Sequence, residues 1–255
     1  MAATDPFETV NPNGKANALL LADHASNVMP PRYKNLGIGP ADLERHIAYD
    51  VGVAGTTRHL AKLLDAPALL GRFSRLLVDL NRDPSSPNCM PEASDGTPVP
   101  GNRNMSAAER ATRLARYFTP YHRAVDDRLQ AFRKRTVTPS LIAIHSFTPQ
   151  LAGGEPRPWH AGILWDKDPR LARPLLNALR PQRDIEVGDN EPYSAREPNG
   201  YTMVQHGTKA GLPHVVIEIR QDLIAEEKGQ KSWAERLAKV LKDLIARQYK
   251  VERFQ

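Results

Sequence analysis

The stretch NALLLADHASN, residues 17–27, joins an apolar run to an abrupt group of polar side chains. A short apolar run that ends sharply is typical of a buried β-strand, so we expect a strand over residues 17–23. Asp23, His24 and Asn27 follow the run directly or within a few residues. Ligands of open α/β sheets bind at the carboxyl ends of the strands, so this stretch predicts both a sheet and a site at its edge.

Helices and strands alternate along the rest of the chain, which predicts an α/β fold in three layers, with a mixed, mostly parallel sheet flanked by helices. We expect further strands over residues 75–80, 139–147, 160–166, 201–207 and 213–220. We expect helices over residues 39–67, 106–135, 168–180 and 233–249. No linker divides the chain, so we expect one domain over residues 1–255, with its core at about residues 17–250.

Composition narrows the class of protein. No run of eighteen apolar residues occurs, and the N-terminal MAATDPFETV lacks a basic flank before an apolar core, so we expect neither a membrane span nor a secretory signal. The one cysteine, Cys89, excludes an internal disulfide and fits the cytoplasm. The net charge is +6, but the basic residues are scattered and few aromatic residues alternate with them. This pattern predicts a small anionic substrate and no nucleic-acid partner.

Two histidines share one local pattern. His24 and His145 each follow an apolar run and precede small polar residues. Two histidines, one carboxylate and an open position for water make a catalytic zinc site, where the ion lowers the pKa of water and polarises a carbonyl. Glu218 lies inside the apolar run VVIEIR, where a glutamate is costly unless it is paired or used. We therefore expect one zinc ion per chain and Glu218 as the general base.

The third ligand is less clear from the residues alone. Asp23 neighbours His24, so the two side chains of a continuing strand would point to opposite faces. Glu44 lies in the first turn of the helix expected after the first strand, and that turn faces the same edge of the sheet as His24. We favour Glu44, with His46 as its competitor. The carboxylates compared were Asp23, Glu44, Asp50, Asp79 and Glu191.

Taken together, the motifs of the chain resemble those of the N-formylglutamate amidohydrolase family. The resemblance runs from about residue 17 to residue 245 and includes DHASNVMP, HIAYDVGVAGTTRHLA, FSRLLVDLNR, DGTPVPGN, IAIHSFTP, RPWHAGILWD, DNEPYS and VVIEIRQDLI. It implies a fold similar to zinc carboxypeptidases and cell-wall amidases. It also implies metal-dependent hydrolysis of the N-acyl amide of an acidic amino acid, such as N-formyl-L-glutamate. The metal ligands would be His24, Glu44 and His145, and the catalytic glutamate would be Glu218.

An acidic substrate needs cationic partners, and arginine binds a carboxylate through two parallel hydrogen bonds. The expected substrate-binding residues are Arg82, Arg103, Arg220, Asn102 and Asn190. A ligating imidazole usually donates its other N–H to a fixed acceptor, so polar groups are also expected just behind the ligands or at the pocket. These are Asp23, Asn27 and Asp79.

Two alternatives stay open. One is a zinc amidase or peptidase that acts on a larger, cell-wall-type peptide. The other is a basic binding protein that has the same fold and no metal. A serine hydrolase is disfavoured because no G-x-S-x-G motif occurs. The sequence predicts no particular oligomeric state.

Overall fold

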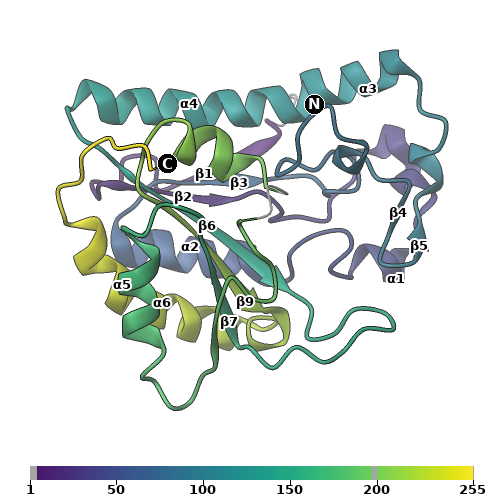
Figure 1. Cartoon of the computed structure of the whole chain (residues 1–255). Coiled ribbons are helices and arrows are strands. Elements are labelled where there is room, and N and C mark those ends of the chain that lie inside the picture. The colour runs from purple at the N-terminus through teal and green to yellow at the C-terminus, as the bar shows by residue number, and fades with distance from the viewer. Residues whose placement is uncertain (1–4, 197–199, 255) are drawn as a thin grey trace.

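The computed structural model describes residues 5–196 and 200–254 and shows a seven-stranded sheet in the order β1-β3-β2-β6-β9-β7-β8 (Figure 1). β1 is antiparallel to β3 and β7 is antiparallel to β9, whereas the other four neighbouring pairs of this sheet are parallel. The mixed, mostly parallel sheet is therefore confirmed. Its strands are β1 (Phe7–Val10), β2 (Ala18–Ala22), β3 (Ala68–Gly71), β6 (Ser140–Phe147), β7 (Ala161–Leu164), β8 (Val187–Asp189) and β9 (His214–Arg220).

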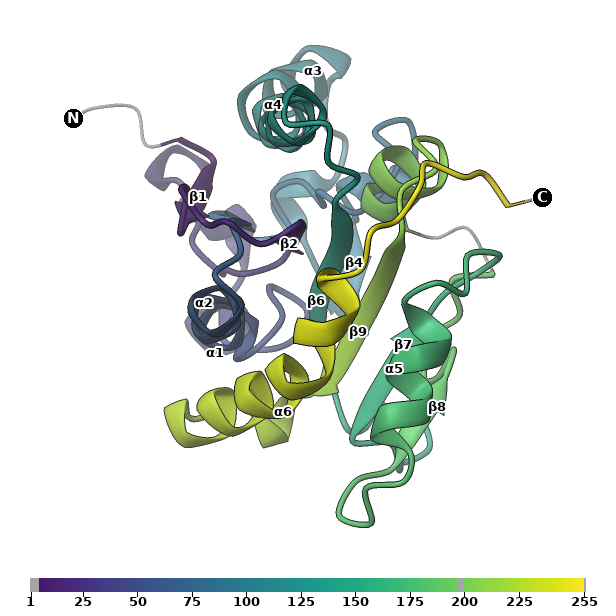
Figure 2. The same ribbon diagram turned by 90° about the vertical axis from the view of Figure 1, so that its left-hand side faces the viewer.

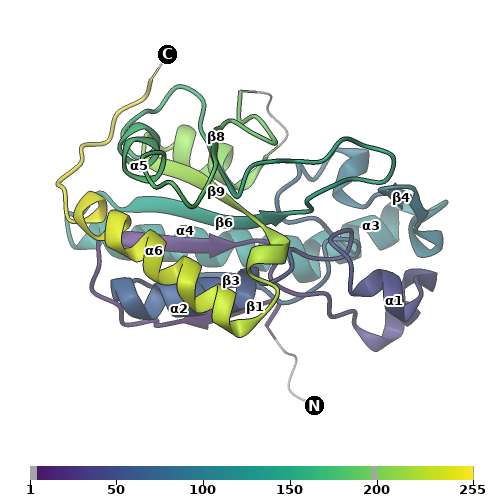
Figure 3. The same cartoon turned by 90° about the horizontal axis from the view of Figure 1, so that it is seen from below.

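Helices cover both faces of the sheet and complete the three layers (Figure 2). One face packs against α2 (Val53–Leu64), α5 (Ala172–Leu179) and α6 (Glu227–Ile245). The other face packs against α4 (Thr119–Lys134), which continues α3 (Ala107–Arg113) through a π-helical turn. Figure 3, seen from below, shows α6 lying beside α2 in front of the sheet. None of the helices in the described ranges is long and apolar enough to cross a bilayer.

The position of β2 inside the sheet, between β3 and β6, explains why its sequence is apolar without interruption. Leu20 packs with the core on the α2 side, whereas Leu19 and Leu21 pack with the core on the α4 side. All three side chains are fully buried. Each contributes roughly 1.5–3 kcal/mol by leaving water. A strand buried on both faces reads as a continuous apolar run rather than an alternating one.

The long helix over residues 106–135 is confirmed in position. Ser106 is its N-cap, and the Ser106 hydroxyl accepts a hydrogen bond from the Glu109 backbone N–H at 3.1 Å. Before this helix, residues 81–106 carry a small hairpin of β4 (Ala93–Ser94) and β5 (Thr97–Pro98). The helix expected over residues 39–67 is wrong in its first half. It consists of a single turn, α1 (Pro40–Leu43), then an irregular segment, and then α2.

Two expected strands are wrong. Residues 75–80 form turns, because side chains satisfy their backbone groups: Asn102 donates to the Leu76 carbonyl at 2.9 Å, and Arg113 donates to the Leu77 carbonyl at 3.3 Å. Residues 201–207 lie in a helical turn that includes the π-helical stretch Val204–Thr208. Both runs are largely buried, so apolar composition correctly indicated burial but not the type of element.

Candidate functional site

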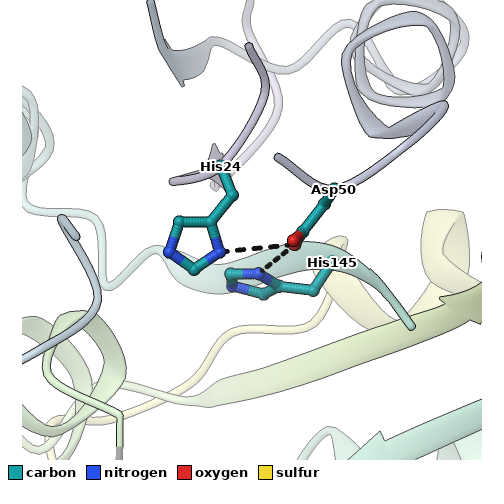
Figure 4. A group of neighbouring side chains, drawn as sticks. All are labelled: His24, Asp50 and His145. Carbon is teal, nitrogen blue, oxygen red and sulfur yellow. Dashed lines mark hydrogen bonds and ion pairs between the residues drawn. The ribbon is translucent and has the colours of Figure 1, made fainter. Parts of the chain in front are cut away.

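Three side chains from separate parts of the chain meet at the carboxyl edge of the sheet (Figure 4). His24 follows β2, His145 lies near the end of β6, and Asp50 lies three residues before α2. The Asp50 backbone N–H donates to the His24 carbonyl at 2.9 Å, which fixes the irregular segment against β2. Asp50 Oδ2 lies 2.8 Å from His145 Nδ1 and 3.4 Å from His24 Nδ1. The two imidazoles therefore face the same carboxylate oxygen.

The other nitrogen of each imidazole faces a second carboxylate. His24 Nε2 lies 2.7 Å from Asp79 Oδ1, and His145 Nε2 lies 3.5 Å from Asp23 Oδ2. The Tyr121 hydroxyl donates to Asp23 Oδ1 at 2.6 Å and so orients that carboxylate. Carboxylates behind histidine ligands fix the ring orientation and the tautomer and raise the basicity of the ligating nitrogen.

Arg75 joins two of these carboxylates. Its Nη2 donates to Asp79 Oδ2 at 2.8 Å, and its Nη1 donates to Asp50 Oδ1 at 3.3 Å. Burial alone would raise the pKa of Asp79, but Arg75 and His24 hold that pKa well below its usual value. In the same way the pKa of Asp50 is lowered against its burial by His24 and His145. Both carboxylates are therefore ionised at neutral pH.

Glu218 lies beside this group on the neighbouring strand. It is the register partner of His145 across the β6–β9 ladder, and its side chain is buried. Glu218 Oε2 has no hydrogen-bond partner among the described residues. Burial raises the pKa of Glu218 to about 7, with the His145 ring opposing the shift. A buried carboxyl with a free oxygen and a pKa near neutrality is suited to accept and return a proton.

The donors present fit a metal ion. One ligand atom from each of His24, Asp50 and His145 lies within 4.8 Å of the others, and all three side chains are buried. His24 Nδ1, which faces Asp50, makes no hydrogen bond to any described residue. Two imidazoles and one carboxylate, each held by a further polar group, are the donor set of catalytic zinc sites.

Glu44 lies outside this group. It follows α1, where its Oε1 accepts a hydrogen bond from Asn27 Nδ2 at 3.1 Å. Asn27 also donates to the Leu43 carbonyl. Asn27 therefore holds the end of α1 and does not support His24 or His145. Asp23 and Asp79, in contrast, lie directly behind His145 and His24.

The two expected substrate-binding asparagines bond to loops instead of facing the group. Asn102 is buried and bridges the carbonyls of Leu76 and Pro91. Asn190 is also buried, and its Oδ1 accepts from the backbone N–H groups of Trp165 and Ala195. Both asparagines therefore hold loops.

The three expected arginines lie in different surroundings from one another. Arg103 is exposed after a 3₁₀ turn at Pro100–Asn102. Arg220 pairs with Asp222, with Nε 2.8 Å from Oδ1. Arg82 Nη1 donates to the Asn81 carbonyl at 3.0 Å.

Sequence reasoning weighed Asp50 but did not choose it, and it gave Arg75 no role behind the ligands. The signal for Arg75 was present, because Arg75 and Asp79 are four residues apart and form an ion pair in the turn. Tyr121 lies on α4, 98 residues from its partner Asp23, and no local pattern points to that contact.

A cavity of about 570 Å³ opens at the carboxyl ends of β6 and β9. Thr148 and Gln221 line it, each three residues beyond His145 and Glu218 respectively. His46 and Asp95 also line it, with His46 Nε2 3.2 Å from Asp95 Oδ2. Glu44 also lines this cavity, whereas His24, Asp50, His145 and Glu218 do not.

Comparison with known proteins places the chain in a family. The crystal structure of gene product Atu2144 from Agrobacterium tumefaciens is 33% identical, with a TM-score of 0.91 and 96% of each chain covered. That of N-formylglutamate amidohydrolase from Ralstonia eutropha JMP134 shares the fold at 22% identity and a TM-score of 0.68, covering 94% of this chain and 97% of that one. No curated protein matches. The family model for N-formylglutamate amidohydrolase matches residues 16–225, most of the chain. The chain therefore belongs to the N-formylglutamate amidohydrolase family.

Proposed function

We propose that the chain is a zinc-dependent enzyme that hydrolyses the N-acyl amide of a small acidic amino acid, with N-formyl-L-glutamate as the leading substrate. Family membership supports the amide hydrolysis. The observation that carries the proposal is the meeting of His24, Asp50 and His145 beside a buried Glu218 with a free oxygen. One catalytic domain over residues 1–255 and a cytoplasmic location belong to the same proposal.

We propose that His24, Asp50 and His145 hold one zinc ion, with Asp50 in the role that the sequence assigned to Glu44. A bound zinc ion supplies a water of lowered pKa and polarises the acyl carbonyl. Asp79 and Asp23 keep the two imidazoles in the required orientation. Arg75 holds Asp50 and Asp79 in place and offsets part of the negative charge of the buried carboxylates.

Glu218 moves the proton in this proposal. Burial raises its pKa to about 7, so Glu218 is suited to accept a proton from the attacking water. The water oxygen forms the new bond to the acyl carbon, and the amide C–N bond breaks. Glu218 then returns its proton to the leaving nitrogen, so the products are a carboxylic acid and an amino acid. Proton transfer of this kind contributes about 10²–10⁴-fold to a rate.

The experiment combines elemental analysis of the purified protein with an assay of formate release from N-formyl-L-glutamate. We expect about one zinc per chain, lost in His24→Ala, Asp50→Asn and His145→Ala. Glu44→Gln and His59→Ala are the matched controls and should keep the metal, because His59 lies on α2 outside the group. Glu218→Gln should keep the zinc and lose at least about 100-fold in kcat.

Three outcomes would count against the proposal. Protein that holds no metal and takes up none would remove the mechanism. Loss of zinc in Glu44→Gln with full retention in Asp50→Asn would return the third ligand to Glu44. Activity on a cell-wall peptide with none on N-formyl amino acids would favour the larger-substrate alternative.

A further inference from the structure

The arginines that border the catalytic group and the cavity differ in their partners. Arg75 pairs with Asp50 and Asp79, Arg45 pairs with Asp42 and Asp95, and Arg220 pairs with Asp222. Each of these cations is already neutralised by a carboxylate of the protein. None of the three is free to take a substrate carboxylate without giving up an ion pair.

Arg157 differs from these three arginines. It is half-buried, and no carboxylate of residues 5–196 or 200–254 lies within 4.0 Å of its guanidinium nitrogens. Its Nη1 donates to the Tyr193 hydroxyl at 3.0 Å and to the Thr148 carbonyl at 3.3 Å, both neutral oxygens. Its guanidinium carbon lies 4.9 Å from the centre of the Tyr193 ring. Its Nε and Nη2 donate to no described residue, so one edge of the guanidinium remains available.

Arg157 and Tyr193 stand beside the catalytic group. The Thr148 carbonyl that anchors Arg157 belongs to a residue lining the cavity. On the other side, Gly162 of β7 is the register partner of Glu218, and its missing Cβ leaves room for the Glu191 carbonyl. The chain therefore passes over Gly162, next to Glu218, two residues before Tyr193. Burial raises the pKa of Tyr193 and the Glu218 carboxylate raises it further, in agreement with this placement.

We propose that Arg157, assisted by the Tyr193 hydroxyl, binds the α-carboxylate of the substrate. An arginine without an ion-pair partner at the rim of a site is a natural partner for a carboxylate, because its planar fork donates a hydrogen bond to each of the two oxygens. The α-carboxylate is the group for this position, because it lies one carbon from the nitrogen that Glu218 protonates. The inference rests on the proposed function and names the residues that recognise its substrate.

The test measures binding apart from turnover. Titration calorimetry on the full, metal-containing chain in a Glu218→Gln background would compare N-formyl-L-glutamate, N-formyl-L-glutamine and the α-amide of N-formyl-L-glutamate. Arg157→Gln should raise the Kd of both α-carboxylates by about 10- to 100-fold. The α-amide should bind weakly with or without the substitution. Arg135→Gln, an arginine that lies over Phe132 at the end of α4, is the matched control and should change nothing.

The outcomes separate this inference from the proposed function. The inference is overturned if Arg157→Gln binds both acids with a Kd within twofold of that of the Glu218→Gln chain. It is also overturned if the Glu218→Gln chain binds the α-amide as tightly as the acids, or binds none of the three compounds. If the acids bind through Arg157 but the wild-type chain releases no formate, the inference stands and the proposed function fails. In a chain that keeps Glu218, the single substitution Arg157→Gln should raise KM for N-formyl-L-glutamate and leave kcat within a few-fold of the wild-type value.

Discussion

Gly162 allows a close contact that shapes the candidate site, so replacing it by alanine gives a direct test. A Cβ at this position would lie 1.9 Å from the Glu191 carbonyl oxygen, whereas Cβ contacts under 3.0 Å essentially never occur. The contact must therefore open by about 1.1 Å, the difference between these distances. Overpacking of this kind costs about 1–3 kcal/mol.

The shift should also reach the substrate. Moving the Glu191 backbone displaces Tyr193, the partner of Arg157, so Gly162→Ala should raise KM for N-formyl-L-glutamate. Its zinc content should stay unchanged, because the proposed ligands come from other segments.

Urea unfolding, steady-state kinetics and elemental analysis measure the three effects. Gly39→Ala is the control: its Cβ would meet nothing within 4 Å, so its free energy of unfolding should stay within about 0.5 kcal/mol. The reasoning is refuted if Gly162→Ala matches this control in both stability and KM.

Three further predictions test the helix cap, the pKa of the partly buried His214 and the support of the metal site. Ser106→Ala should lower the free energy of unfolding by about 1 kcal/mol, and Ser106→Thr should keep most of it; equal losses would count against the cap. Burial lowers the pKa of His214 below its unfolded value of about 6.5, so the unfolded chain takes up the proton first and stability is lost as the pH falls below that value. His214→Gln should therefore lose less stability than wild type between pH 7 and pH 5 in urea titrations, and parallel losses would argue against it. Asp79→Asn should weaken zinc binding by about 10- to 100-fold in a chelator competition, because it supports His24; unchanged affinity would contradict that role.

The sequence predicted the part of the fold that depends on long, regular patterns. The buried strands β2, β6 and β9 and the helix capped by Ser106 lie in the ranges that the sequence predicted for them. Residues 75–80 and 201–207 were mistaken for strands, because a short apolar run reports burial and not hydrogen bonding. What decides the structure of residues 75–80 is a pair of distant side chains, Asn102 and Arg113.

The same distinction applies to the site. His24, His145 and Glu218 come from β2, β6 and β9 or directly after them, and these strands are parallel neighbours. Their carboxyl ends share one edge, so a strand pattern was enough to bring the three residues together. The contacts of Arg75 and Tyr121 depend on turns and a helix whose positions relative to the sheet no local pattern gives.

Asp50 shows why one residue of the proposed metal site was assigned differently. The family resemblance implies an acid at the start of the helix that follows the first strand, and the sequence suggested that this helix begins at Pro40. In the structure this helix is α2, which begins at Val53, because Gly52 adopts a left-handed conformation with φ of 79°. A Cβ at Gly52 would lie 2.0 Å from the Ile224 carbonyl oxygen. Gly52 therefore separates the segment into an isolated turn and α2. An acid near the start of α2 is Asp50, and its backbone N–H donates a hydrogen bond to the His24 carbonyl.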